Sequence, residues 1–234
     1  MLGEWMTRIV VRTYKFAVLA ITRVSGRILA PKKLAKNPNM SEQKLCFIDV
    51  ETTGCDDTRG HEIHQISAII TDLNAKEVLG EFSSTFQPFE SSGKYDPAAL
   101  EKCGLTEESL LARPKDCREG FLDFIHFLSK FCDRFDKKDK LQFVAYNAKF
   151  DDRFIRSWFT KHCDNYFGSW FWNPSICVMQ SIAWLAREKR SEFANFRLET
   201  MCKLANIEFN EEDAHDARYD IQKTLELYRF LIEL

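Results

Sequence analysis

The sequence predicts an α/β protein, a β-sheet flanked by helices, and three observations lead to that prediction. Three strand-like segments, 44–51, 65–73 and 82–89, follow one another in the first half of the chain. A further apolar strand, 141–147, leads directly into a helical pattern. The closing segment, 216–233, carries apolar residues at helical spacing. Successive strands followed by alternating strands and helices are typical of a sheet covered by helices.

The first three strands are predicted from runs of β-branched and aromatic residues bounded by turn signals. The polar segments GCDDTRG and NAKEVLG separate these runs, and they are rich in residues that favour turns. Such short connections predict an antiparallel meander.

The helices are predicted from apolar periodicity. The segment YDPAALEKCGLTEESLLARP predicts two short helical turns, and 119–135 places phenylalanines on one face of a helix. Helix 148–161 buries Phe150, Phe154, Ile155 and Trp158 on one side. Residues 175–189 and 196–206 are also predicted to be helical.

The charge distribution divides the chain into two parts. The 234 residues are 45% hydrophobic, which suits one globular domain with a substantial core. Residues 1–40 contain eight of the 33 Lys and Arg but one of the 35 Asp and Glu, so they carry +7 and the remainder carries −9. We therefore predict a basic amphipathic leader or disordered tail over 1–43 and a folded domain over 44–234.

The leader leaves several alternatives open. Its charges interrupt the apolar stretch too often for a membrane span or for a secretory signal. A mitochondrial-type presequence, a helix on an anionic membrane surface, a poorly ordered tail, and upstream sequence before a start at Met40 all remain.

Eight scattered cysteines indicate a reducing compartment. None of them forms a C-x-x-C pair, so free thiols are expected rather than a zinc site or disulfides. We predict a cytoplasmic location or another reducing intracellular compartment, with mitochondria as an alternative that follows from the leader.

Two acids, Asp49 and Glu51, interrupt the apolar strand FIDVETTG. Residues i and i+2 of a strand point to the same face, so both carboxylates aim at one place near the end of the strand. Two anions about 4 Å apart repel by about 4 kcal/mol at an effective dielectric of 20. A bound divalent cation reverses the sign of this interaction, and oxygen ligands favour Mg²⁺ or Mn²⁺. The alternative is an exposed strand end with solvated acids.

Further acids begin two other elements. Asp151 lies in the first turn of the helix after strand 141–147, and Asp220 follows His215 by five residues at the start of the closing helix. Each acid also has a simpler explanation, compensation of the helix dipole, for which Asp216 is available too. Histidine is the side chain whose ordinary pKa suits proton transfer near neutral pH.

Taken in order, D49-x-E51, N147-x-x-x-D151 and H215-x-A217-x-x-D220 resemble the motifs of the DEDD (DnaQ-like) 3′→5′ exonuclease superfamily, in its His-type (DEDDh) subgroup. The likeness covers about 44–234 and extends to CGLTEESL and FRLETMCKLANIEF. It implies a ribonuclease-H-like fold with a mixed five-stranded sheet flanked by helices.

The resemblance also implies roles for individual residues. Two Mg²⁺ (or Mn²⁺) ions would be held by Asp49, which bridges both, by Glu51 and Asp220 on one ion, and by Asp151 on the other. His215 would be the general base. Substrate-binding roles are expected for a further set: Thr52, Asn147, Leu105 and Phe150. Cys103 and Tyr146 stand where the family commonly has histidines, so base contacts are left open.

The function implied is a metal-dependent 3′→5′ exonuclease that hydrolyses terminal phosphodiesters of single-stranded nucleic acid and releases nucleoside 5′-monophosphates. DNA is favoured over RNA because DVETTG is closer to the proofreading form of the motif, which suggests DNA repair or proofreading. A ribonuclease-T-like exoribonuclease, as a homodimer, is the first alternative, and a non-catalytic nucleic-acid or polymerase adaptor is the second. Because no C-terminal docking tail follows the third motif, a stand-alone enzyme is expected rather than a polymerase subunit.

The segment YFGSWFWNP (166–174) packs five aromatic residues into nine positions. We predict that it closes part of the core beneath a loop. The alternatives are a base-stacking lip and a partner-binding surface.

Overall fold

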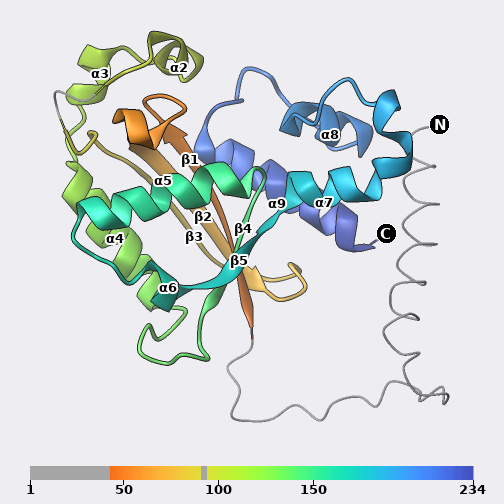
Figure 1. Cartoon of the computed structure of the whole chain (residues 1–234), viewed down its shortest axis with the longest axis horizontal. Helices are drawn as coiled ribbons and strands as arrows, with labels where there is room; N and C mark the ends of the chain where they lie inside the picture. Colours follow the sequence, from red (N-terminus) through yellow and green to blue (C-terminus); the bar gives the residue numbers. More distant parts are fainter. Residues whose placement is uncertain (1–42, 91–93, 234) are drawn as a thin grey trace.

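A five-stranded mixed sheet forms the centre of the protein (Figure 1). The computed structural model describes residues 43–90 and 94–233. The strand order is β3-β2-β1-β4-β5, with β1 in the middle. The strands are β1 (Lys44–Thr52), β2 (Ile63–Asp72), β3 (Val78–Thr85), β4 (Leu141–Ala145) and β5 (Phe171–Cys177).

The pairing of the strands confirms the predicted meander and the predicted mixed sheet. β1 pairs with β2, and β2 with β3, in antiparallel orientation. β1 pairs with β4, and β4 with β5, in parallel orientation. The acid-bearing strand β1 is therefore the point where the sheet changes from antiparallel to parallel pairing.

Helices cover both faces of this sheet. In chain order the helical elements are η1 (Asp57–Arg59), α2 (Pro97–Lys102), α3 (Glu107–Leu111), α4 (Cys117–Ser129), α5 (Ala148–Lys161), α6 (Phe167–Trp170), α7 (Val178–Leu185), η2 (Arg187–Glu192), α8 (Leu198–Leu204) and α9 (Ala217–Glu233). Helix α5 has the bounds predicted from its periodicity.

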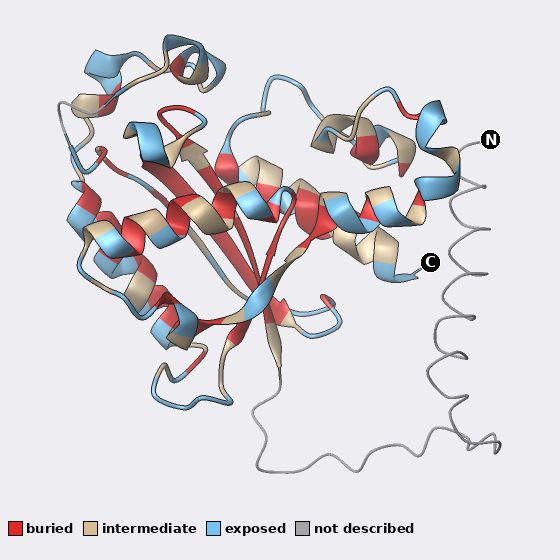
Figure 2. Cartoon of the chain, viewed as in Figure 1, coloured by how far each residue is buried: buried red, intermediate tan, exposed pale blue. Residues whose placement is uncertain are grey.

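Alternate residues of β1 build two separate cores. Cys46, Ile48 and Val50 join a cluster with side chains of α4 and α5, whereas Leu45 and Phe47 join a cluster with α7, α8 and α9. Strands β1, β2 and β4 are the most continuously buried part of the sheet (Figure 2). Because side chains alternate across a strand, Asp49 and Glu51 lie on the α9 side of the sheet.

Two predicted helices were partly wrong. The helix expected over 119–135 begins at Cys117, because Asp116 and Glu119 form a capping box there, and it ends at Ser129. The helix expected over 175–189 begins only at Val178, because 171–177 form strand β5 beside β4, and it gives way to the 3₁₀ turn η2.

The predicted third strand was also misplaced. Strand β3 begins at Val78 and ends at Thr85, not over 82–89, because its register follows β2 from Thr71 to Gln65.

The aromatic segment 166–174 belongs to the core. Phe167, Trp170 and Phe171 are buried, so the predicted core role is confirmed for these side chains, which lie in helix α6 and at the start of strand β5. Tyr166 is exposed.

The predicted leader covers residues 1–43, and all of it except Gln43 lies outside the described residues. Within the described ranges, no helix has the length and apolar character needed to cross a membrane.

Candidate active site

The C-terminal end of β1 presents Asp49 and Glu51 to a cavity of about 510 Å³, called here the acid cavity. The last parallel pair between β1 and β4 is Phe47 with Val144, so the end of β1 extends beyond the pairing with β4. The β1–β2 register is irregular between Glu51 and Thr52. This end of the strand is therefore free to project carboxylates toward neighbouring helices.

Asp151 enters the acid cavity from helix α5, which starts three residues after β4 ends. Its carboxylate Oδ1 accepts a hydrogen bond from the backbone N–H of Val50 at 3.3 Å. This bond attaches the first turn of α5 to the middle of the acid-bearing segment of β1. Asn147, at the N-cap position, makes no capping hydrogen bond with its side chain.

His215 and Asp220 come from the start of α9. The backbone of His215 has φ of 65°, a left-handed conformation that is uncommon for a residue other than glycine. Its N–H donates to Asp220 Oδ2 at 3.4 Å. Asp220 Oδ1 is buried and has no hydrogen-bond partner among the described residues. A buried carboxylate oxygen without a donor indicates a missing cation or donor.

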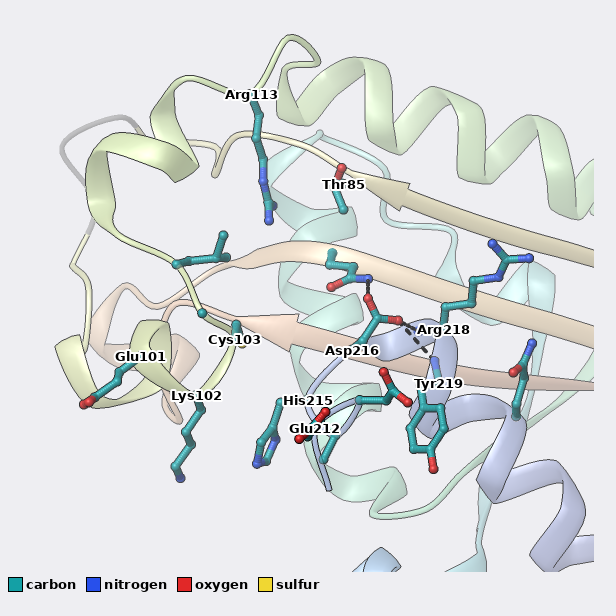
Figure 3. A pocket seen from close by; sticks show the side chains of 16 residues that line it. Thr85, Glu101, Lys102, Cys103, Arg113, Glu212, His215, Asp216, Arg218 and Tyr219 are labelled. Atoms are coloured by element: carbon teal, nitrogen blue, oxygen red, sulfur yellow. Dashed lines mark hydrogen bonds between the residues drawn. The ribbon is translucent and has the colours of Figure 1, made fainter. Parts of the chain in front are cut away.

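Asp216 takes the helix-capping role that was the alternative explanation for these acids. Its Oδ1 accepts from the N–H groups of Arg218 and Tyr219, and its Oδ2 accepts from the amide of Gln65 (Figure 3). Because Asp216 satisfies the start of α9, Asp220 is left to face the acid cavity.

These elements bring the four predicted acids and the predicted histidine into one cavity. Asp49, Glu51, Asp151, His215 and Asp220 all line it. One ligand atom from each of Glu51, His215 and Asp220 lies within 4.8 Å of the other two. The residues come from β1, α5 and the start of α9, which are far apart in the chain.

Burial makes this cluster unfavourable as a set of bare anions. The pKa of Asp49 is raised well above its ordinary value, first by burial and then by Asp151 and Glu51. Burial, with Asp220 next in importance, raises the pKa of Glu51 to about 8. Burial likewise raises the pKa of Asp151 to about 7 and that of Asp220 to about 6. A bound cation would remove this cost and lower the pKa values again.

The imidazole of His215 is shifted toward its neutral form. Burial, and then the positive charge of Lys102, lower its pKa below the ordinary value. A neutral imidazole near pH 7 can accept a proton.

The donor set fits divalent cations that prefer oxygen. Four carboxylates meet in one place, one of them with an unsatisfied buried oxygen, and one histidine stands beside them. Carboxylate oxygens are the ligands of Mg²⁺ and Mn²⁺ in phosphate-processing sites.

Three of the four predicted substrate-binding residues lie in the acid cavity. Thr52, Asn147 and Phe150 line it, and Thr52 Oγ1 donates to the carbonyl of Gly54 at 2.7 Å. Leu105 lies instead in a second cavity of about 650 Å³, called here the adjoining cavity (Figure 3). The two cavities share Lys102, Cys103 and His215 as walls.

The structure adds residues to the site that were not predicted to belong to it. Gly54 and Cys55 line the acid cavity, and Arg153 of α5 holds their loop by donating to the carbonyl of Cys55 at 2.7 Å and pairing with Asp57 at 2.8 Å. Arg153 lies two residues after Asp151, so its place in the motif was a usable signal. Cys103 Sγ contacts Glu51 Oε2 at 3.4 Å.

Comparison with known proteins supports the resemblance seen in the motifs. Residues 46–228 match the family model described as exonuclease. Ribonuclease T of Shewanella sp. (strain W3-18-1) is 26% identical over 201 residues, which cover 79% of this chain and 79% of that protein. The DNA polymerase III PolC-type of Bacillus cereus is 28% identical over 185 residues, 79% of this chain and 11% of the polymerase.

Solved structures share the fold. The zinc-bound complex of E. coli exonuclease I with single-stranded DNA has a TM-score of 0.64 at 22% identity, over 82% of this chain and 41% of that chain. The nuclease domain of 3′hExo, a DEDDh family member bound to rAMP, has a TM-score of 0.62 at 15% identity, over 82% and 92%. This chain thus spans less than half of the exonuclease I chain.

The predicted fold and the predicted enzyme class, a 3′→5′ exonuclease, are confirmed by these findings. The three motifs lie inside the matched residues, and they place their acids and histidine in one cavity. The chain belongs to the exonuclease family, with the motif pattern of its DEDDh subgroup.

Proposed function

We propose that the chain removes nucleotides from the 3′ end of single-stranded nucleic acid and releases nucleoside 5′-monophosphates, with two Mg²⁺ or Mn²⁺ ions as cofactors. The observation that supports this proposal is the meeting of Asp49, Glu51, Asp151 and Asp220 with His215 in one cavity. Their raised carboxyl pKa values and the unpartnered Asp220 Oδ1 are what a cation site without its cation would show.

Each of the five residues of the site has a distinct task in this proposal. Asp49 would be shared by both ions, Glu51 and Asp220 would hold one, and Asp151 would hold the other. Bound divalent cations supply electrostatic stabilisation of the attacking and leaving oxygens in an in-line displacement. His215 accepts the proton of the attacking water, and its lowered pKa favours the neutral imidazole that this step needs.

The terminal nucleotide would occupy the acid cavity beside the acids. Thr52 is buried at the end of β1, and Phe150 of α5 lines the cavity half-buried, with its ring packed against Phe154. Stacking on an aromatic ring tolerates any base, which suits an exonuclease that proceeds along a strand. Asn147, exposed and without a capping bond, is free to contact the sugar-phosphate backbone.

We propose DNA as the substrate because DVETTG is closer to the proofreading form of the motif. The relation to ribonuclease T over 79% of both chains favours RNA as a second candidate. The 2′-hydroxyl is the chemical group that separates the two, and a protein reads it by a local hydrogen bond or by exclusion.

The direct test compares DNA and RNA oligonucleotides of one sequence, labelled at the 5′ end, with and without Mg²⁺. We expect shortening from the 3′ end that needs Mg²⁺ and that falls at least about 100-fold in Asp49→Ala and His215→Ala. Asp123→Ala, on the exposed side of α4, is the matched control and should keep full activity. If the wild-type protein leaves both oligonucleotides as intact as Asp49→Ala does, the proposed function is wrong.

A reducing compartment and a homodimer remain predictions. All eight cysteines are free, and five of them are buried. Sedimentation of the purified chain would decide the oligomeric state.

A further inference from the structure

The adjoining cavity is a second, larger hollow beside the acid cavity, and the proposed chemistry does not use it. Its volume is about 650 Å³, within the range of pockets that hold small ligands. Its walls come from the end of α2, the α3–α4 connection, the ends of β2 and β3, and the start of α9. Through Lys102, Cys103 and His215 it opens beside the cluster of acids.

Arg113 reaches into this cavity from the α3–α4 connection, while His215 borders it from the segment before α9 (Figure 3). The guanidinium Nη1 donates to the carbonyl of His64 at 2.6 Å and to the carbonyl of Phe86 at 3.2 Å. It also lies 3.2 Å from Nδ1 of the buried His64. These contacts fix one side of the planar group and hold it in place.

No described carboxylate forms an ion pair with Arg113. Its recorded partners are two carbonyl oxygens and a neutral imidazole, none of which cancels its charge. Burial lowers the pKa of Arg113, as expected for a partly desolvated cation without an acid beside it. Several other arginines do have a carboxylate partner: Arg153 pairs with Asp57, Arg156 with Asp152, and Arg187 with Glu188.

The acids that line the adjoining cavity are either engaged in hydrogen bonds or exposed to solvent. Asp216 is bound by the start of α9 and by Gln65, and Asp213 accepts from the side chain of Asn210 at 2.7 Å. Glu101 and Glu212 are exposed. A half-buried cation that is held rigidly and lacks a counter-charge is suited to bind an anion from outside the protein.

We propose that Arg113 binds a backbone phosphate of the nucleic-acid strand on the 5′ side of the cleaved bond, and that the adjoining cavity holds the nucleotide next to the terminal one. This inference rests on the proposed function, because it takes the terminal nucleotide to lie in the acid cavity. Arginine is suited to the role because its fork of donors matches the oxygens of a phosphate.

Leu105 fits the same arrangement. Leu105 lies in the adjoining cavity with Arg113 and not among the acids. The base that it was predicted to contact would therefore lie at the border of the two cavities. Tyr219 provides an aromatic ring on the opposite wall, from α9. The cavity therefore offers one guanidinium for phosphate and apolar surface for a base.

The test is a set of oligonucleotides that each carry one uncharged methylphosphonate linkage, one, two or three positions 5′ of the scissile bond. For the wild-type protein with Mg²⁺ we expect one position to lower kcat/KM by about 10- to 100-fold, the range for a charge-assisted hydrogen bond. Arg113→Gln should lose a similar factor on the unmodified strand and show no further loss from the methylphosphonate at that position. Arg187→Gln, a surface arginine outside both cavities, should keep the wild-type pattern.

Thymidine 5′-(4-nitrophenyl phosphate), which has a scissile phosphodiester but no further phosphate, separates this inference from the proposed function. We expect wild type and Arg113→Gln to cleave it at equal rates. If Arg113→Gln is as sensitive as wild type to every methylphosphonate, the inference is wrong while the exonuclease stands. If wild type cleaves neither substrate, the proposed function itself has failed.

Arg113→Gln could fail to fold, because two carbonyls lose their donor. In that case the methylphosphonate series with the wild-type protein still tests whether a phosphate contact exists. An absence of any sensitive linkage over the three positions would overturn the role of Arg113.

Discussion

Asp216 and Asp220 lie four residues apart, and their hydrogen bonds give them opposite roles. Asp216 is satisfied by two backbone N–H groups and one amide, as a helix-capping acid should be. Asp220 has one long bond to the backbone of His215 and one buried oxygen with no partner. At the scale of single residues, this difference supports the proposal that Asp220 ligates a cation, whereas Asp216 serves the fold.

His64 gives a pH dependence that is independent of the cation site. It is fully buried in β2, and burial together with the charge of Arg113 lowers its pKa to about 3. The unfolded chain takes up this proton near the ordinary value of about 6.5, whereas the folded protein does not. The stability that the neutral imidazole provides is thus present above pH 6.5 and is lost as the pH falls toward about 3.

We expect the free energy of unfolding of the wild type to fall by up to about 1 kcal/mol per pH unit below pH 6 from this residue alone. Urea unfolding at pH 7 and pH 5 measures this change in the free energy of unfolding. In His64→Gln the free energy of unfolding should fall less over the same interval. An equal loss in both proteins would contradict the assignment.

The four acids and the histidine of the site were predictable because each stands in a motif at the end of an element. Asp49 and Glu51 follow from strand periodicity, and His215 and Asp220 from the closing helix. Arg113 was not predictable, because its role depends on two backbone carbonyls and a buried imidazole that tertiary folding brings to it. The exclusion of Leu105 from the acid cavity likewise depends on how the α2–α3 turn is placed.

At the scale of elements, β5 is the one strand whose position was not predicted from the sequence. It follows directly on the short helix α6 and contains Asn173 and Pro174, residues that favour turns and edges. Its pairing with β4 is irregular between Gln142 and Val144. A short edge strand with a proline lacks the alternation from which the other strands were recognised.

Helix α5 also controls the loop on the far side of the acid cavity. Arg153 holds the carbonyl of Cys55 and the carboxylate of Asp57, so this loop is tied to the same helix that carries Asp151. We expect Arg153→Ala to raise KM for an oligonucleotide about 3- to 10-fold with little change in kcat, since loss of one partly exposed ion pair and one hydrogen bond costs about 1 kcal/mol.

Steady-state kinetics test this expectation, with faster hydrogen exchange of residues 54–60 as a second measurement. Arg156→Ala is the matched control, because Arg156 lies on the same helix and contacts Asp152 and the ring of Phe167 but neither Cys55 nor Asp57. A fall in kcat with unchanged KM would assign Arg153 to the chemistry instead of to the loop.

At the scale of the whole molecule, the acid cavity is where three separately anchored parts of the fold meet. β1 lies at the centre of the sheet, α5 packs on one face, and α9 packs on the other. Without a cation, burial and the mutual repulsion of these carboxylates disfavour the folded state in which they are ionised. The folded pKa of Glu51, about 8, and of Asp151, about 7, lie above the values of the unfolded chain.

These shifts fix the sign of a final prediction. A carboxyl group whose pKa is raised on folding favours the folded state at low pH, and this contribution is lost as the pH rises through about 7 to 8. In EDTA at pH 8, Asp49→Asn should therefore be more stable than wild type by about 1 to 3 kcal/mol, because one of the repelling charges is gone. Excess Mg²⁺ at about 100 times its dissociation constant should stabilise wild type by about 3 kcal/mol and Asp49→Asn by much less. Thermal unfolding in EDTA and in Mg²⁺ measures both effects, and Asp123→Asn, an exposed acid of α4, should respond as wild type does. If Asp49→Asn gained nothing in EDTA, the acids would not be repelling each other, and the main physical argument for a cation between them would be lost.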